Sequence, residues 1–285
     1  MIAVTGASGQ LGRLVIHQLL KKVAPDQVVA VVRSPETAAD LRALGVLLRK
    51  ADYDDSASLQ EAFQGIEKVL LISSTVPGQR LRQHKAVIDA ARAAGVKLIA
   101  YTSMLRADSS RSVLAGEHLA TENYLIASGV DYVVLRNGWY LENHTAGLPI
   151  AAQHGALMAS SGSGRFASAS RADYASAAVA VLTQSGHSKK IYELAGDTAL
   201  TMDDLAVAAS ARLHREISYR NLPPAEYEGA LLGMGLPKMI VEVVIDADAM
   251  ALKGDLDSTS RELSTLIGRP TTTLAEAVQS ALPVQ

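Results

Sequence analysis

The chain has 285 residues, 48% of them hydrophobic, which is enough to bury a full core in one large or two unequal domains. It carries 27 basic and 29 acidic residues without a Lys/Arg-rich run, which argues against nucleic acid as a partner. It has no cysteine, which excludes disulfides, thiolate metal sites and a cysteine nucleophile, and its seven histidines show no metal-ligand spacing, so we expect no metal.

The chain begins with a glycine-rich turn between a strand and a helix. Residues 1–12 read M-I-A-V-T-G-A-S-G-Q-L-G, in which a short apolar run meets Gly6, Gly9 and Gly12 and a helical pattern follows. Such a turn presents bare backbone N–H groups at the positive end of a helix dipole, which favours a bound phosphate or pyrophosphate. The spacing differs from the usual G-x-G-x-x-G fingerprint, and a plain helix-start turn could also hold three glycines.

Short apolar runs then alternate with helical patterns. The expected strands are Ile2–Val4, Val28–Val32, Val46–Arg49, Val69–Ile72, Leu98–Tyr101 and Tyr132–Leu135. The expected helices are Leu11–Lys22, Pro35–Leu44, Ser56–Phe63, Leu81–Ala94 and Leu114–Ser128. Near-continuous apolar strands are typical of a sheet covered on both faces. The alternation therefore predicts an α/β fold with a doubly wound parallel sheet of the Rossmann type, whose ligands bind outside the carboxyl ends of the strands.

After Leu135 the alternation ends. Residues 136–143 favour a loop, and residues 159–164 (A-S-S-G-S-G) favour a small, flexible segment. The further elements that we expect are helices at Thr145–His154, Arg171–Leu182, Met202–Arg212, Ala225–Met234, Pro237–Leu252, Arg261–Ile267 and Leu274–Leu282, and a strand at Lys190–Leu194. We therefore predict a Rossmann domain of residues 1–135 plus about 167–195. A smaller, mostly helical substrate-side domain would comprise about 136–166 plus 196–285.

Arg33 follows the second expected strand, where an NAD-specific site usually offers Asp or Glu to the ribose hydroxyls. A guanidinium can instead bind a 2′-phosphate with two hydrogen bonds, so Arg33 indicates NADP(H). The alternative is a solvated arginine at a strand end, and Glu36 weakens the inference slightly.

Polar residues also follow the next strands at the same edge. Asp52 could accept a hydrogen bond from an adenine amino group, or it could be a loop acid that leads into a helix. Ser73, Ser74 and Thr75 could line the coenzyme groove, and Tyr101 ends the fifth strand. Each of these residues could instead be an ordinary strand terminus.

A set of motifs runs along nearly the whole chain: G-A-S-G-Q-L-G at 6–12, Arg33, A-D-Y at 51–53, G-V-K-L-I-A-Y-T-S at 95–103, E-N-Y-L at 122–125, L-R-N-G-W-Y at 135–140, A-S-R-A-D-Y-A at 169–175, Y-E-L-A-G-D at 192–197 and L-I-G-R-P-T-T-T-L-A-E at 266–276. Together they resemble the NmrA-like group of atypical short-chain dehydrogenases/reductases, and within it the quinone-reducing bacterial members. The resemblance implies a Rossmann fold, bound NADPH and reduction of quinones. It assigns the pyrophosphate to Gly6, Ala7, Ser8, Gly9, Gln10 and Leu11, the 2′-phosphate to Arg33, and the flanks of the nicotinamide and substrate to Asn137, Gly138, Trp139 and Tyr140.

One departure from the family concerns the proton donor. Ordinary members carry Y-x-x-x-K, and the matching positions here are Leu114 and His118, so both members of the pair are absent. Quinone reduction tolerates this loss, because a hydroquinone anion is stabilised by its ring and can take a proton from water. We therefore expect no single indispensable acid.

Candidates for substrate contacts remain. Tyr101 and Asn137 could bond a quinone oxygen, and His118 and His144 could polarise it or relay a proton. Trp139 and Tyr140 could wall the pocket with aromatic faces. The alternatives are structural histidines and ordinary aromatic packing.

Two other functions fit the same residues. An NADP-binding regulator without catalysis would also lack the Tyr–Lys pair, and an NADPH-dependent reductase could act on another acceptor, such as an azo or triphenylmethane dye. Residues 135–143 resemble the quinone enzymes more closely. No apolar stretch reaches the roughly 18–20 residues of a membrane span, and no secretory signal is recognised, so we expect a cytoplasmic protein. A homodimer stays open.

Overall fold

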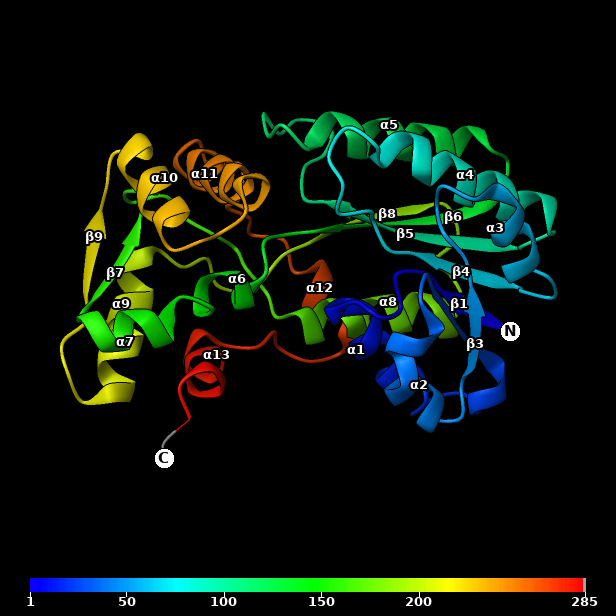
Figure 1. Cartoon of the computed structure of the whole chain (residues 1–285), viewed down its shortest axis with the longest axis horizontal. Coiled ribbons are helices and arrows are strands. Elements are labelled where there is room, and N and C mark those ends of the chain that lie inside the picture. The colour runs from blue at the N-terminus through cyan, green and yellow to red at the C-terminus, as the bar shows by residue number, and fades with distance from the viewer. Residues whose placement is uncertain (284–285) are drawn as a thin grey trace. The chain divides into compact units, whose positions relative to one another are not determined.

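Seven parallel strands form the sheet of the first of two units in this computed structural model, which describes residues 1–283 (Figure 1). The first unit comprises Met1–Asp108, Leu114–Asn137 and Arg171–Leu194. The second unit comprises Ser109–Val113, Gly138–Ser170 and the chain from Ala195 onward.

The strands of the first unit are β1 (Ile2–Val4), β2 (Val28–Val32), β3 (Leu47–Lys50), β4 (Lys68–Leu71), β5 (Leu98–Met104), β6 (Asp131–Asn137) and β8 (Lys190–Leu194). Their order is β3-β2-β1-β4-β5-β6-β8, with Val4 beside Ala30 of β2 and Leu70 of β4. The chain therefore changes direction between β1 and β4, which is the switch point where such sheets bind ligands. The predicted doubly wound parallel sheet is confirmed.

Helices cover both faces of this sheet. They are α1 (Gln10–Leu19), α2 (Ala39–Ala43), α3 (Ser56–Ala62), α4 (Arg80–Ala93), α5 (Ala115–Ala127) and α8 (Arg171–Thr183). α1 packs on α8 on one face, while α4 packs against α3 and α5 on the other (Figure 1). The core beneath α3, α4 and α5 is built from buried apolar side chains such as Phe63, Val87 and Leu125. Asp55 begins α3 because its carboxylate accepts the N–H groups of Ala57 and Ser58.

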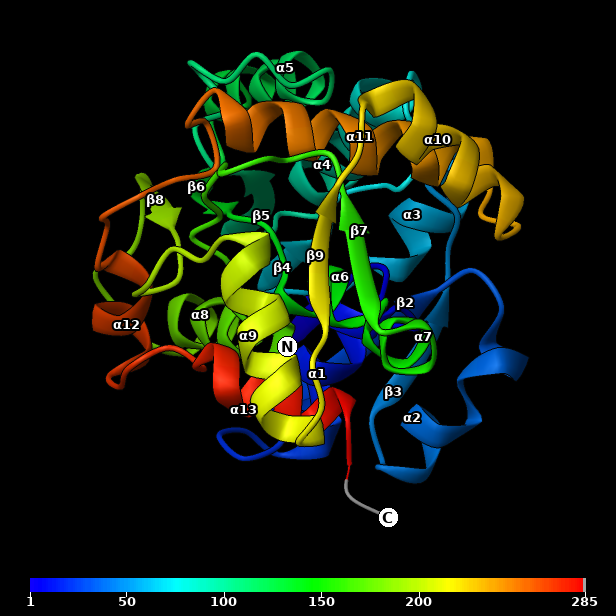
Figure 2. The same cartoon turned by 90° about the vertical axis from the view of Figure 1, so that its left-hand side faces the viewer.

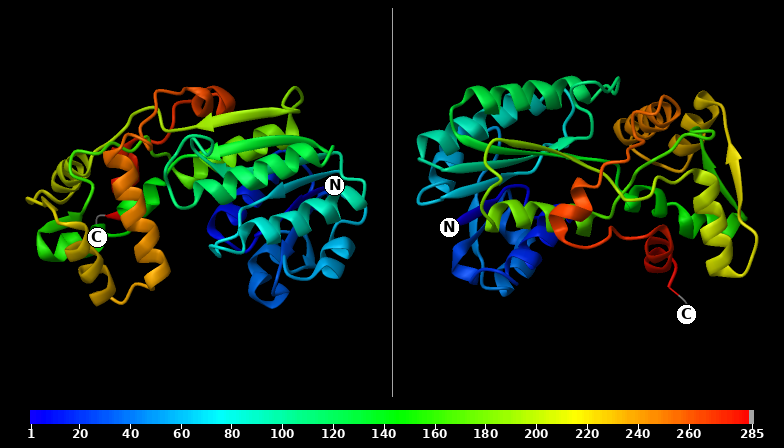
Figure 3. Two further views of the ribbon diagram at one scale, coloured as in Figure 1. Left: turned by 90° about the horizontal axis from the view of Figure 1, so that it is seen from above. Right: turned by 180° about the vertical axis from the view of Figure 1, so that it is seen from behind.

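The second unit is mostly helical. It contains α6 (Leu141–Thr145), α7 (Leu148–His154), β7 (Ala156–Ala159), α9 (Met202–Leu213), β9 (Ser218–Asn221), α10 (Pro224–Gly233), α11 (Lys238–Leu252), α12 (Glu262–Ile267) and α13 (Leu274–Ala281). β7 and β9 form a parallel pair (Figure 2), and α10 packs on α11 (Figure 3). Capping boxes at Thr201 and Thr273 begin α9 and α13. None of the helices formed by residues 1–283 combines the length and apolar character that a membrane span requires.

Several local predictions are wrong. The loop expected at 136–143 instead contains the end of β6 and the start of α6, and the helix expected at Thr145–His154 is interrupted at Gly147. The segment 159–164, expected to be small and flexible, is anchored at Ser160, which is buried and whose N–H donates to the Asp248 carboxylate at 2.7 Å. β7 and β9 escaped prediction because A-L-M-A and S-Y-R-N lack β-branched residues and become strands through their mutual pairing.

Candidate coenzyme site

The glycine loop follows β1 at the switch point of the sheet. Gly6 has φ +59°, a conformation that favours glycine, and Gly9 begins α1 without a side-chain cap. The first hydrogen bond of α1 joins the Arg13 N–H to the Gly9 carbonyl at 3.0 Å, so the N–H groups before Arg13 have no carbonyl partner within the helix. No acidic side chain occupies the first turn of this helix. The loop thus offers donors and a positive dipole end to a pyrophosphate.

Gly12 brings the helix very close to the loop. A Cβ atom at this position would lie 2.5 Å from the Gly6 carbonyl oxygen and 2.7 Å from the Ala7 Cα atom. Both neighbours are backbone atoms and cannot rotate away. Only glycine therefore fits this position, and the cradle in front of α1 keeps its shape because no side chain enters it.

The six residues predicted to hold the pyrophosphate divide into two groups. Gly6, Gly9 and Gln10 are exposed and Ser8 is half-buried, whereas Ala7 and Leu11 are buried in the first unit. The exposed group presents the loop to solvent, and the buried group anchors it. The pattern is compatible with the predicted pyrophosphate site, since an anion needs backbone N–H groups rather than side chains.

Arg33 stands at the same sheet edge. It directly follows β2, the neighbour of β1, and its side chain is exposed. Asp52 follows β3, and its Oδ1 atom accepts the Asp54 N–H at 3.1 Å. This bond is compatible with the loop role that is the alternative to adenine recognition, and the adenine contact stays a prediction.

Tyr53 connects three loops at this edge, a role that sequence reasoning missed. Its hydroxyl lies 2.5 Å from the Thr5 Oγ1 atom and 2.9 Å from the carbonyl oxygen of Ile72. The Thr5 hydroxyl in turn bonds the carbonyl oxygen of Leu70. The loops after β1, β3 and β4 are therefore tied together, and burial raises the pKa of the Tyr53 phenol. The A-D-Y motif at 51–53 contained this residue, but no periodicity pointed to its partners.

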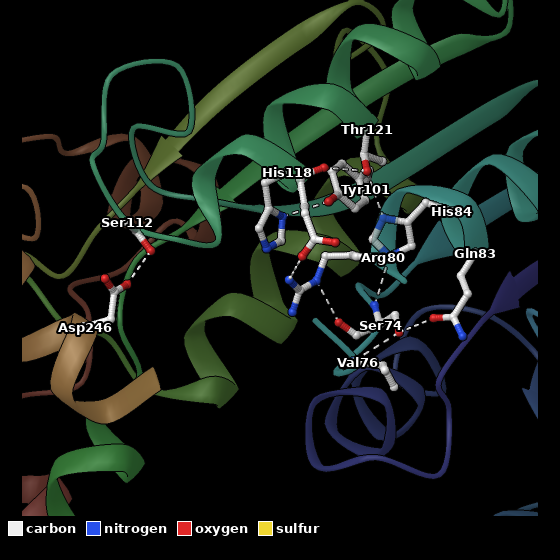
Figure 4. A network of polar contacts seen from close by, with 11 residues as sticks. Ser74, Val76, Arg80, Gln83, His84, Tyr101, Ser112, His118, Thr121 and Asp246 are labelled. Atoms are coloured by element: carbon white, nitrogen blue, oxygen red, sulfur yellow. Dashed lines mark hydrogen bonds and ion pairs between the residues drawn. The ribbon is translucent and has the colours of Figure 1, made fainter. Parts of the chain in front are cut away.

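The loop after β4 is held by the first turns of α4. The Ser74 N–H donates to Nε2 of His84 at 2.9 Å, the Ser74 carbonyl accepts from Nε of Arg80 at 2.8 Å, and the Ser74 hydroxyl donates to Gln83 (Figure 4). Gln83 also donates to both carboxylate oxygens of Asp54 at 3.1 Å. This network fixes Ser74, and the Ser73 N–H donates to the Thr102 hydroxyl at 2.9 Å. Thr75, the third residue predicted to line the groove, is exposed.

The histidine beside Ser74 is neutral. Because the Ser74 N–H occupies Nε2 of His84, the ring proton is on Nδ1, which lies 3.0 Å from Thr121 Oγ1 (Figure 4). Burial, together with the charge of Arg80, lowers the pKa of His84 to about 3. His84 therefore acts as a fixed hydrogen-bonding group in this loop and carries no charge at neutral pH.

His118 and Tyr101 form a second buried pair on α5 and β5. Nδ1 of His118 lies 2.7 Å from the Tyr101 hydroxyl, and Tyr101 is fully buried (Figure 4). Burial lowers the pKa of His118 to about 3 and raises the pKa of Tyr101. A neutral His118 cannot supply the positive charge that a lysine supplies at this position in ordinary family members. The placement of Tyr101 favours a strand-core role over contact with a quinone, which stays untested.

Asn137 ends β6, and its buried side-chain oxygen lacks a hydrogen-bond donor in the part of the chain that the structure describes. Its Oδ1 atom is buried and has no hydrogen-bond partner among residues 1–283. The preceding Arg136 is fixed by a bidentate pair with the buried Glu122, with contacts of 2.7 and 3.0 Å, and by Glu193 at 2.7 Å. An unsatisfied buried acceptor costs roughly 1–3 kcal/mol, so a donor from a ligand amide would stabilise Asn137.

Known proteins share this architecture along the whole chain. A family model described as NAD(P)H-binding matches residues 6–185. Quinone oxidoreductase 2 of Escherichia coli is 51% identical over 278 residues, which cover 98% of this chain and 97% of that protein. This chain belongs to the NAD(P)H-binding, NmrA-like family of atypical short-chain dehydrogenases/reductases.

Two solved structures extend the match. The NADPH-dependent quinone oxidoreductase from E. coli, complexed with NADPH, has a TM-score of 0.95 and 51% identity and covers 98% of this chain and 99% of its own. The triphenylmethane reductase of Citrobacter sp., complexed with NADP(H), has a TM-score of 0.96 and 39% identity and covers 99% of this chain and 100% of its own. The capless N-terminus of α1, the glycine cradle and the open Asn137 acceptor suit the dinucleotide that both of these structures contain.

The remaining candidates of this NmrA-like chain lie in the second unit. Trp139 packs partly buried on the core of that unit, and Gly138 and Tyr140 are half-buried beside it, with Tyr140 forming a β-bridge with Ala169. His144 is buried with its Nε2 atom 3.0 Å from the Ser168 hydroxyl, and burial lowers its pKa to about 4. Packing of Trp139 and a structural role for His144 are the alternatives that these contacts favour.

Proposed function

We propose that this chain is an NADPH-dependent oxidoreductase that transfers hydride to quinones without a Tyr–Lys pair. The observation that carries the proposal is the 51% identity to E. coli quinone oxidoreductase 2 over nearly the full length of both chains. The unit with the seven-stranded sheet binds the coenzyme, and the second unit carries the substrate-side residues Trp139 and Tyr140.

The residues of this chain bind the coenzyme and orient it. NADPH, when bound, supplies the hydride. Backbone N–H groups at the start of α1 would hold the pyrophosphate, Arg33 would hold the 2′-phosphate, and Asn137, whose buried Oδ1 atom lacks a hydrogen-bond partner among the described residues, would flank the nicotinamide. Tyr53, His84 and Gln83 support these groups without contacting the coenzyme, because they fix the loops after β3 and β4.

No side chain in this arrangement serves as a dedicated general acid. His118 and His144 are neutral at pH 7, and the buried Tyr101 phenol is a weaker acid than a free one. A hydroquinone anion takes its proton from water, so the protein's contribution is to position a flat acceptor and the coenzyme.

A direct assay tests the proposal. Purified protein is mixed with NADPH and 1,4-benzoquinone, and the loss of NADPH absorbance is followed against a no-enzyme blank, with a triphenylmethane dye as a second acceptor. Rapid oxidation with the quinone supports the proposal. Calorimetric binding of NADPH without turnover identifies a sensing regulator, and turnover with the dye alone identifies a different reductase.

Two finer points are proposed alongside. A cytoplasmic location fits a chain without cysteine, and cell fractionation tests it. A homodimer is the assembly that we propose, and light scattering of the purified protein tests it. A monomeric mass would refute the second point without affecting the first.

A further inference from the structure

We propose that Arg13 and Asp40 form a clamp that positions the glycine loop against the segment after Arg33 and so sets the preference for NADPH over NADH. The inference rests on the proposed function, because it concerns the same coenzyme site. It assigns a role to two residues, neither of which contributes to the glycine motif or to the predicted phosphate contacts.

The Arg13 guanidinium joins three segments of the first unit. Its Nε and Nη2 atoms donate to the two carboxylate oxygens of Asp40 at 2.7 and 2.9 Å, which is a bidentate pair. Its Nη1 atom donates to the Ser8 carbonyl, and Nη2 also donates to the Thr37 carbonyl at 3.3 Å. Ser8 lies in the glycine loop, while Thr37 and Asp40 follow Arg33 by four and seven residues.

Apart from the clamp, the two segments are held by different contacts. The glycine loop keeps backbone bonds from Ala7 N–H to Val31 at 3.3 Å and from Gly9 N–H to Gly6 at 3.0 Å. The segment after Arg33 is anchored by the buried side chains of Ala38 and Leu41 and shaped by local bonds between Thr37 and Ser34, which do not reach the glycine loop. Loss of the clamp therefore removes the Arg13 bonds that join the Arg33 segment to the glycine loop and lets the spacing of the two vary.

This difference predicts an effect on coenzyme selectivity. NADH and NADPH share the pyrophosphate site, whereas only NADPH carries the 2′-phosphate, which needs Arg33 at a fixed distance from that site. A loosened segment must be ordered when NADPH binds, and this ordering lowers affinity for NADPH specifically. The clamp contributes little electrostatic attraction to the 2′-phosphate, because the Asp40 carboxylate neutralises the charge of Arg13.

The test compares Arg13→Ala, Asp40→Ala and the double variant Arg13→Ala/Asp40→Ala with wild type. Calorimetry measures the Kd for NADPH and for NADH, and quinone assays measure kcat and KM. We expect each of the three variants to weaken NADPH about 3- to 10-fold and NADH less than about 2-fold, with kcat at saturating NADPH unchanged. Arg13→Lys should recover little of the loss, because lysine has no planar fork to bridge Asp40 and Ser8.

The double variant separates a clamp from simple charge effects. If Arg13 acted on the 2′-phosphate through its charge, Asp40→Ala would strengthen NADPH binding and the double variant would return to wild type, and either result would overturn the proposal. Equal weakening of NADPH and NADH would also overturn it. Failure of wild type to bind NADPH at all would instead refute the proposed function.

A matched control removes an arginine from another exposed ion pair. Arg92 pairs with Asp89 at 3.5 Å in the last turn of α4, away from the carboxyl ends of the strands. Arg92→Ala should leave both Kd values unchanged. Exposed ion pairs contribute little to stability, so all of these variants should melt close to wild type, which separates positioning from a folding defect.

Discussion

The glycine loop and the α4–α5 network are both polar, but they satisfy their hydrogen bonds differently. At the start of α1 the backbone donors face solvent without a side-chain cap, and Gly12 keeps the space in front of them clear. Between α4, α5 and β5, the buried side chains of His118 and Tyr101 bond each other, and the buried His84 bonds Ser74 and Thr121. The loop has polar groups left for a ligand, whereas the network has already used its own.

This contrast separates binding from support. Open polar groups that are held rigidly are ready to bind an anion without rearrangement. Buried groups with partners stiffen the loops around them, and burial keeps their histidines neutral. A titratable residue that lies near a binding site is therefore not necessarily a catalytic acid or base. Each prediction below tests either the ligand-binding loop or the supporting network.

The largest effect is expected from Gly12→Ala. The new Cβ would lie 2.5 Å from the Gly6 carbonyl oxygen, so the loop or the helix must move and the cradle is lost. We expect affinity for NADPH to fall more than about 100-fold, equivalent to over ~2.7 kcal/mol. Calorimetry measures the loss, and circular dichroism checks that the fold persists. Gly116→Ala, where an added Cβ meets no atom within 4 Å, is the matched control. Full binding by Gly12→Ala would show that the cradle is not the site.

Arg33→Asp should have the next largest effect. A carboxylate in place of the exposed guanidinium repels a 2′-phosphate and can bond the ribose hydroxyls of NADH. We expect KM for NADPH to rise about 10- to 100-fold while KM for NADH falls or stays the same. Steady-state kinetics with both coenzymes measures the change. Unchanged NADPH kinetics would remove Arg33 from the site.

The roles proposed for these two residues were accessible to sequence reasoning because they depend on local patterns. Glycine spacing after an apolar run and an arginine at a strand end can be read within a few positions, and so can strands such as V-V-A-V-V at β2.

The network could not be read in this way. His118 and Tyr101 are 17 residues apart, Thr121 and His84 are 37 apart, and Arg13 and Asp40 are 27 apart. Only the order of strands brings such pairs together. The short strands β7 and β9 escaped for the same reason, since each is stabilised by a partner about 60 residues away, as in Ala156 beside Ser218.

Acid should destabilise the network side of the molecule. The unfolded chain binds a proton at each histidine below pH 6.5, but folded His118 stays neutral down to about pH 3. Its stabilising contribution is therefore full above pH 6.5 and is lost as the pH falls toward 3. His118→Asn should reduce the slope of unfolding free energy against pH by about 1 kcal/mol per pH unit in that range. Denaturant titrations from pH 7 to 4 measure the slope, with the exposed His17→Asn as control. An unchanged slope for His118→Asn would contradict its burial.

The smallest effect is expected on turnover from His118→Asn and His144→Asn. Both imidazoles are buried and neutral, and each bonds a hydroxyl, Tyr101 for His118 and Ser168 for His144. If the hydroquinone anion takes its proton from water, neither ring is required, and kcat with benzoquinone should fall less than about 5-fold, far below the 10²- to 10⁴-fold typical of a general acid. The pH profile of kcat should likewise show no step between pH 6 and 8 that disappears in either variant. If one variant lost turnover but kept its affinity for NADPH, that histidine would act on the substrate and not merely support the loops. A purely supporting group acts through the position of a loop, so its loss would change KM as well.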